Sequence, residues 1–164
     1  MADQGVYLYN RSLEFLTGEG VAKDEERAFR LNADSAKLGH GDAVLAMGWF
    51  YLNGTGVPRD LELARKWYKK SARKGDPRAM FSLGQMTYDA RDFADALLWF
   101  NRAIEKGHAR SVFWLGKLYW HGRGVVQDKK RASGLFRNAA RKKVPEAQRA
   151  LTWLARRRGG PTRG

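Results

Sequence analysis

The sequence predicts an all-α protein: a right-handed α-solenoid of about four helix-turn-helix repeats, followed by one C-terminal capping helix. The first observation is a repeated tetrapeptide, Gly-x-Gly-Val, which begins at Gly18, Gly54 and Gly122. The second is an Asp six residues after each of these, at Asp24, Asp60 and Asp128. A fourth Asp, Asp92, divides the long interval, so that the four are spaced by 36, 32 and 36 residues. Internal similarity at such periods is the signature of a stacked repeat protein.

Each Asp is followed by one amphipathic pattern, which predicts the second helix of a repeat. Ala always stands four residues after the Asp, Leu or Trp seven after it, and Ser or Ala eleven after it. These offsets lie on one face of an α-helix. The Asp is placed to cap the helix N-terminus. The left-handed residue that ends a helix is predicted at Gly39, Gly75 and Gly107, with Lys143 in the fourth repeat.

A first helix precedes each second helix, and we expect these first helices over residues 7–17, 43–53, 79–89 and 111–121. In three of them a Met or Leu is followed by a glycine, at Gly48, Gly84 and Gly116. Because Gly has no Cβ, a neighbouring helix can approach closely, with an aromatic residue such as Tyr51 or Tyr119 beside it. A last helix is predicted over residues 147–158, where Leu151 and Trp153 supply apolar side chains.

The pattern from Leu115-Gly116 through Gly122-x-Gly124-Val125 to Asp128 resembles a Sel1-like repeat, a relative of the tetratricopeptide repeat. The resemblance covers residues 7–158. We predict a single repeat domain over 1–158, with units at 7–42, 43–78, 79–110 and 111–146, a closing helix at 147–158 and a flexible basic tail at 159–164. The first unit departs from the pattern with Arg11-Ser12 in place of Leu-Gly, and the third unit lacks the Gly-x-Gly-Val turn.

Resemblance to tetratricopeptide units implies that the first helices line a concave groove that binds a peptide. The candidate groove residues are Tyr9, Leu13, Trp49, Asn53, Gln85, Phe113, Lys117, Trp120, His121, Arg149 and Trp153. Aromatic rings give contact area at low entropic cost, and amides satisfy a peptide backbone. The alternative is that rings at helical spacing form the core, as we expect for Leu45, Phe81, Phe113 and Tyr88. For Trp49 and Trp120 the groove is favoured, because Tyr51 and Tyr119 already fill the core positions.

The net charge of +14 is concentrated near the C-terminus. The net charge is −3 over residues 1–42, +5 over 43–78, zero over 79–110 and +12 over 111–164. A basic half of this kind attracts polyanions such as nucleic acid or acidic lipid. The alternative function is therefore non-specific polyanion binding through a basic patch of Arg141, Lys142, Lys143, Arg156, Arg157 and Arg158. The simpler interpretation is a solvated, solubilising face.

Enzyme chemistry has little support in the sequence. It contains no Cys, and its three histidines, His40, His108 and His121, fall in separate repeats. Neither a Ser-His-acid arrangement nor a phosphate-binding Gly-Lys-Ser/Thr loop is visible. The Gly-x-Gly-Val turns join helices, whereas a dinucleotide fingerprint follows a strand. We therefore predict no catalytic residue, no metal site and no cofactor.

The leading hypothesis is a non-catalytic adaptor that presents its groove to a protein or peptide partner. We expect a monomer with weak self-association, because Trp153 lies in a groove position and can contact a further chain. No apolar run approaches the ~20 residues that cross a bilayer, and no export signal is visible. We accordingly expect a cytoplasmic protein, or a periplasmic or secreted one if a signal peptide has been removed.

Overall fold

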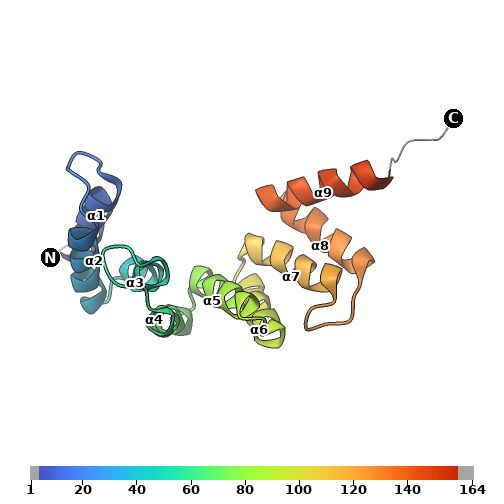
Figure 1. The fold of residues 1–164 in the computed structure, drawn as a ribbon, viewed down its shortest axis with the longest axis horizontal. Coiled ribbons are helices and arrows are strands. Elements are labelled where there is room, and N and C mark those ends of the chain that lie inside the picture. The colour runs from blue at the N-terminus through green and yellow to red at the C-terminus, as the bar shows by residue number, and fades with distance from the viewer. Residues whose placement is uncertain (1–3, 159–164) are drawn as a thin grey trace. The chain divides into compact units, whose positions relative to one another are not determined.

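The structure is a computed structural model that describes residues 4–158, and within this range it contains nine α-helices and no strand (Figure 1). The first helices of the repeats are α1 (Gln4–Thr17), α3 (Gly41–Asn53), α5 (Pro77–Asp89) and α7 (Ala109–His121). The second helices are α2 (Glu25–Lys37), α4 (Leu61–Arg73), α6 (Phe93–Glu105) and α8 (Lys129–Arg141), and α9 (Pro145–Arg158) follows them. The all-α repeat fold is confirmed. The tail predicted over residues 159–164 lies outside the described residues.

The predicted helix caps are confirmed. Each of the four Asp carboxylates accepts a hydrogen bond from the backbone N–H three residues later, at 2.8 to 3.1 Å. This bond satisfies one of the donors that a helix N-terminus leaves unpaired. After the second helices, the backbone is left-handed at Gly39, Gly75, Gly107 and Lys143. The first helices end at the predicted residues and begin two or three residues earlier than predicted.

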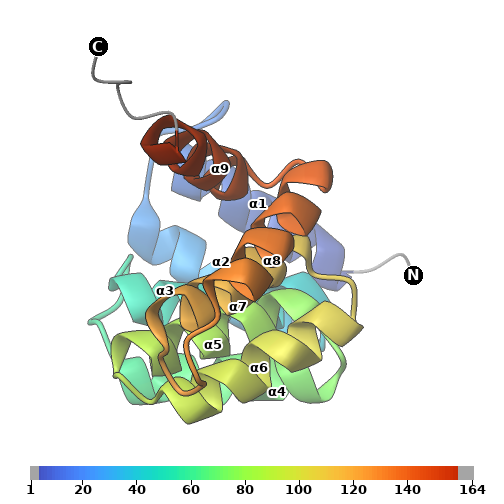
Figure 2. The same cartoon turned by 90° about the vertical axis from the view of Figure 1, so that its right-hand side faces the viewer.

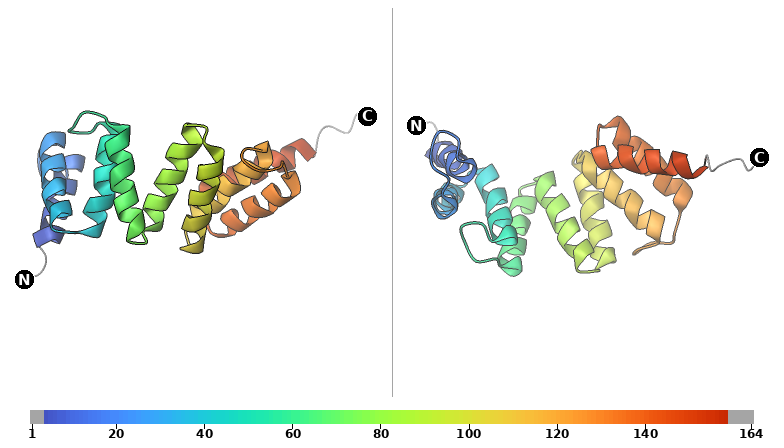
Figure 3. Two further views of the ribbon diagram at one scale, coloured as in Figure 1. Left: turned by 90° about the horizontal axis from the view of Figure 1, so that it is seen from below. Right: turned by 45° about the horizontal axis from the view of Figure 1, so that its top comes forward.

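The chain forms two compact units that divide between Ala79 and Met80, within α5. In the first unit, α1 packs on α2 and α3 packs on α4, as Figure 3 shows for the blue and the cyan-to-green helices. A cluster of Ala36, Ala43, Val44 and Met47 joins these two pairs. In the second unit, α8 lies between α7 and α9 and contacts both (Figure 2). The cluster that holds these three helices together consists of Val112, Ala139, Val144 and Ala147.

A glycine of the first helix meets an aromatic ring of the second helix in three repeats. A Cβ added to Gly48 would lie 2.6 Å from the ring of Tyr68. The corresponding distances are 2.5 Å from Gly84 to Phe100 and 2.6 Å from Gly116 to Phe136. The close approach predicted at these glycines is confirmed. The ring against each glycine, however, belongs to the second helix, eight residues after the capping Asp, and was not identified from the sequence.

The first repeat replaces this glycine–ring pair with two small polar residues. Ser12 stands at the glycine position and Asn32 at the ring position, and both are buried. The Ser12 hydroxyl donates to the carbonyl of Ala28 at 2.7 Å, and the Asn32 amide donates to the carbonyl of Ala43 at 3.0 Å. Because Asn is smaller than Tyr or Phe, it leaves room for the Ser side chain. The Arg11-Ser12 departure in the sequence is thus compensated at Asn32.

The second glycine of the Gly-x-Gly-Val turn packs against the preceding repeat. Gly56 and Gly124 have φ angles of 64° and 68°. A Cβ at Gly56 would lie 2.0 Å from the carbonyl oxygen of Glu25, at the start of α2, and one at Gly124 would lie 2.8 Å from that of Phe93, at the start of α6. Gly20 in the first repeat has no described atom within 4 Å of such a Cβ. The turn therefore contributes to the contact between successive repeats.

Candidate functional site

An apolar cavity of about 280 Å³ opens in the second unit, where α7 and α9 both pack on α8. We call it the tryptophan cavity, and it is lined by Phe113, Lys117, Trp120, His121, Phe136, Ala150, Trp153 and Leu154. One of these residues, Phe136, is the ring that lies against Gly116. Six of the eight lining residues are apolar. The cavity is thus suited to an apolar group larger than one methyl.

Two tryptophans from different helices form one wall of the tryptophan cavity. The ring centroids of Trp120 and Trp153 are 6.3 Å apart at 76°, an edge-to-face arrangement. Trp120 is half-buried and also lies 6.2 Å from Phe136. Trp153 keeps 46% of its surface exposed, although aromatic pairs of this geometry usually form in protein cores. An exposed Trp held by packing on one side offers a preformed contact for another chain.

The two polar residues that line the cavity are Lys117 and His121. The Lys117 ammonium lies 3.8 Å from the ring centroid of Trp114 and 5.1 Å from that of Tyr88. Burial lowers the pKa of Lys117, and the nearby positive charge of Arg123 lowers it further. Burial, followed by the charges of Arg123 and Lys117, lowers the pKa of His121 below its ordinary value of 6.5. His121 is therefore neutral at pH 7 and can donate or accept a hydrogen bond.

A second hollow, of about 430 Å³, adjoins the tryptophan cavity between α8 and α9. We call it the cationic cleft, and it is lined by Trp120, Lys129, Lys130, Ser133, Arg137, Trp153, Leu154 and Arg157. Two of its cations lie over the tryptophan rings: the Lys129 ammonium is 5.6 Å from the Trp120 centroid, and the Arg157 guanidinium 4.3 Å from the Trp153 centroid. Such cation–π contacts favour these side-chain positions. The cleft thus combines four basic side chains with two aromatic ones.

The structure brings together five of the eleven candidate groove residues, namely Phe113, Lys117, Trp120, His121 and Trp153. Gln85 is half-buried on α5, and Arg149 is exposed on α9. The other four candidates belong to the first unit: Tyr9, Leu13, Trp49 and Asn53.

In the first unit, Leu13 and Trp49 keep 38% and 40% of their surface exposed. Tyr9 is half-buried against His40, with ring centroids 5.0 Å apart. The Asn53 amide donates to the carbonyl of Trp49 at 2.8 Å. The first-unit candidates thus include two exposed apolar side chains, while the polar end of Asn53 serves its own helix.

The four side chains expected to be core differ in their burial. Phe81 and Tyr88 are buried, with 7% and 9% of their surface exposed, which confirms the core interpretation for both. Leu45 and Phe113 are half-buried, and Phe113 lines the tryptophan cavity. The residues expected to be core thus include both buried core side chains and one that lines the tryptophan cavity.

Of the predicted basic patch, only Arg157 lines the cationic cleft. Arg141, Lys142, Lys143 and Arg156 are exposed elsewhere on the second unit, and the side chain of Arg158 lies outside the described residues. Lys129, Lys130 and Arg137 were not among the site residues predicted from the sequence. A signal was present, because positions 129, 133 and 137 recur every four residues and share one face of a helix.

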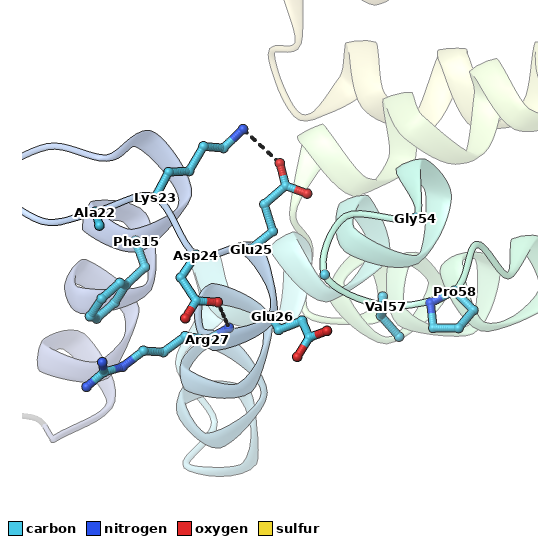
Figure 4. A pocket seen from close by; sticks show the side chains of 11 residues that line it. Phe15, Ala22, Lys23, Asp24, Glu25, Glu26, Arg27, Gly54, Val57 and Pro58 are labelled. Carbon is cyan, nitrogen blue, oxygen red and sulfur yellow. Dashed lines mark hydrogen bonds and ion pairs between the residues drawn. The ribbon is translucent and has the colours of Figure 1, made fainter.

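A larger hollow, of about 780 Å³, lies in the first unit between the start of α2 and the Gly-rich turn after α3 (Figure 4). Four of its charged residues, Lys23, Asp24, Glu25 and Arg27, have partners within the protein. Asp24 caps α2 at the backbone of Arg27, Lys23 pairs with Glu25 at 2.7 Å, and the Arg27 guanidinium lies 4.3 Å from the Phe15 ring centroid. We interpret this hollow as part of the junction between repeats.

The repeated helix pairs, the glycine–ring contacts and the turn glycines together define an α-helical repeat protein. The chain belongs to the Sel1 repeat family, whose model matches residues 4–40, 41–76, 77–108 and 109–144. The resemblance noted in the sequence is thereby confirmed. The helix α9 follows the last matched repeat in the chain, and it supplies Ala150, Trp153 and Leu154 to the tryptophan cavity.

Two solved structures share this fold over most of the chain. A Sel1 repeat protein from Oxalobacter formigenes is 30% identical with a TM-score of 0.82, over 88% of this chain and 60% of that one. The protective antigen c5321 of uropathogenic Escherichia coli, which displays an SLR fold, is 26% identical with a TM-score of 0.80, over 98% of this chain and 35% of that one. The chain is therefore shorter than both.

Among curated proteins, the chitin synthase regulator SKT5 of Saccharomyces cerevisiae is 41% identical over 61 residues, which is 37% of this chain and 9% of the relative. The protein of the same name from Malassezia restricta is 33% identical over 67 residues, or 41% of this chain and 5% of the relative. This chain thus matches less than a tenth of the length of either regulator.

Proposed function

We propose that the protein is a non-catalytic interaction module that binds a peptide or protein segment through the tryptophan cavity. Sel1 repeats generally mediate protein–protein interaction, and the family is typically a non-catalytic scaffold. The observation that supports this site is the pairing of Trp120 with the exposed Trp153 over an apolar floor. The two curated relatives named as regulators of an enzyme are compatible with a module that binds another protein.

The size and lining of the cavity fit one large apolar side chain of a partner. A volume of about 280 Å³ is at the lower end of ligand pockets. Burying a Leu- or Phe-sized side chain is worth about 1.5–3 kcal/mol, so a single anchor supplies much of a weak to moderate peptide affinity. His121 in the lining can hydrogen-bond to the peptide backbone beside the anchor. This arrangement favours binding over bond-breaking chemistry.

The test is selection of a random displayed peptide library on the full chain, followed by affinity measurement on two matched variants. Trp153→Ala and Trp49→Ala each remove an exposed tryptophan, one from the tryptophan cavity and one from the first unit. We expect Trp153→Ala to weaken a selected peptide roughly thirtyfold, as for a hot-spot aromatic, and Trp49→Ala less than twofold. Equal affinity of the natural chain and the Trp153→Ala variant would rule out this cavity as the site.

A further inference from the structure

We infer that the segment bound in the tryptophan cavity is acidic: its apolar anchor is flanked by Asp or Glu residues that occupy the cationic cleft. This inference rests on the proposed function, because it takes the anchor position as given. It goes further by assigning the chemistry of the partner. It is carried by the position of the cationic cleft relative to the cavity, and by the charges that line it.

The tryptophan cavity and the cationic cleft share one wall. Trp120, Trp153 and Leu154 line both hollows. An extended chain advances about 3.3–3.6 Å per residue. A peptide with its anchor on one side of this wall therefore places nearby side chains in the cleft. The two hollows can thus be filled by a single short segment.

The cationic cleft is lined by positively charged side chains, and its lining contains no negatively charged side chain to neutralise them. Lys129, Lys130, Arg137 and Arg157 line it, and none of its eight lining residues carries a carboxylate. The two acidic residues of segment 111–164, Asp128 and Glu146, have other roles. Asp128 caps α8 through the backbone of Arg131, and Glu146 accepts from Arg110. Carboxylates supplied by a partner would therefore meet four cations that share no counter-ion within the lining.

The cations that touch the rings also favour a peptide over a nucleic acid. Bases bound without sequence preference stack on open aromatic faces. Lys129 lies over Trp120, and Arg157 lies over Trp153. The adjoining cavity is lined mainly by apolar side chains such as Phe113 and Ala150, which suit an apolar side chain better than a phosphate. An apolar side chain beside a carboxylate fits both hollows at once.

The experiment compares two variants of equal charge in the full chain. The cleft variant is Lys129→Gln, Lys130→Gln, Arg137→Gln and Arg157→Gln. The control variant is Arg141→Gln, Lys142→Gln, Lys143→Gln and Arg156→Gln, which removes four exposed cations from outside the cleft. Each variant loses four positive charges, the cleft variant from α8 and α9 and the control variant from α8, α9 and the turn between them, so the change in net charge is matched. Thermal unfolding of both variants verifies that they fold.

A random library of 12-residue peptides is selected on the natural chain, and one enriched peptide is titrated against both variants. We expect enriched peptides to contain Leu, Phe, Met or Trp with Asp or Glu within three positions. We expect the cleft variant to bind roughly tenfold more weakly and the control variant less than twofold, with the difference shrinking at high salt.

The other possible results distinguish a failure of this inference from a failure of the proposed function. Enriched peptides with an apolar anchor but no acidic residue, or equal losses in the two variants, overturn this inference and leave the proposed function intact. A library without any anchored peptide overturns the proposed function, and this inference with it. An oligothymidylate of 12 nucleotides that binds the natural chain more tightly than the peptide, and loses binding in the cleft variant, assigns the cleft to nucleic acid instead.

Discussion

Replacing a helical glycine with alanine should have opposite effects at two positions of the second unit. Ala is the better helix former, and the exchange ordinarily stabilises a helix interior by about 0.5–1 kcal/mol. At Gly134 in α8, a new Cβ meets nothing within 4 Å. At Gly84 in α5, the same Cβ would lie 2.5 Å from a ring carbon of Phe100, which is fully buried.

The magnitude at Gly84 follows from this contact. The ring of Phe100 is itself confined, since its centroid lies 6.0 Å from that of Phe81 and 5.8 Å from that of Trp114. Forcing an extra methyl into a packed core costs about 1–3 kcal/mol, and the gain in helix propensity offsets up to about 1 kcal/mol. We therefore expect Gly84→Ala to lower the free energy of unfolding by about 1–2 kcal/mol.

Thermal unfolding by circular dichroism checks this prediction. For a chain of this length, about 1 kcal/mol shifts Tm by roughly 2–4 °C. Gly84→Ala should lower Tm by roughly 2–8 °C, and Gly134→Ala should raise it by roughly 1–4 °C. A double variant, Gly84→Ala with Phe100→Leu, should lose less than the sum of the single losses, because the smaller side chain makes room for the methyl. A rise in Tm for Gly84→Ala would refute the conclusion that the glycine–ring contact sets how closely the two helices of a repeat pack.

Three further predictions concern stability. In urea unfolding, Gly56→Ala should lower the free energy of unfolding more than Gly20→Ala does, because both glycines have a left-handed φ but only a Cβ at Gly56 would clash with backbone. Equal losses would contradict the contact between repeats assigned to this turn. Deleting residues 146–164 exposes the apolar cluster around Val144 in the fourth repeat, so Tm should fall and light scattering should show aggregation. An unchanged melting curve would mean that the fourth repeat needs no cap. Burial raises the pKa of Asp76, but hydrogen bonds from Arg78 outweigh this effect and hold the pKa below 3.8, so the stability that the Asp76–Arg78 pair contributes above about pH 4 is lost on further acidification. Asp76→Asn should therefore reduce the difference in unfolding free energy between pH 7 and pH 3. An unchanged difference would show that this pair does not contribute to the acid response.

The helices and their ends could be predicted from the sequence because local rules set them. Asp60 and Asp128 cap helices that follow them directly, and Gly39 and Gly75 adopt a left-handed φ at a helix end. These effects depend on residues within one turn of each other. The partner of Gly48 could not be predicted in the same way, because Tyr68 lies on the next helix and meets it only once the two helices pack.

The candidate site was predicted in part for the same reason. Trp120 and Trp153 were identified because the repeat pattern left no core position for Trp120 and placed Trp153 in a groove position. Lys129 and Arg137 were not predicted, because the basic patch was assigned to the runs of cations at 141–143 and 156–158. The cationic cleft lies between α8 and the predicted closing helix α9, and the side chains that meet there depend on how these two helices pack.

The measurement that tests the central claim most directly is the nitrogen–proton NMR spectrum of the tryptophan indoles. The chain has six tryptophans, at Trp49, Trp67, Trp99, Trp114, Trp120 and Trp153, so a labelled sample gives one indole signal for each. Adding a selected acidic peptide with an apolar anchor should shift the signals of Trp120 and Trp153 and leave those of Trp49 and Trp67 in place. Shifts at Trp49 with none at Trp120 and Trp153 would contradict the assignment of the tryptophan cavity as the binding site.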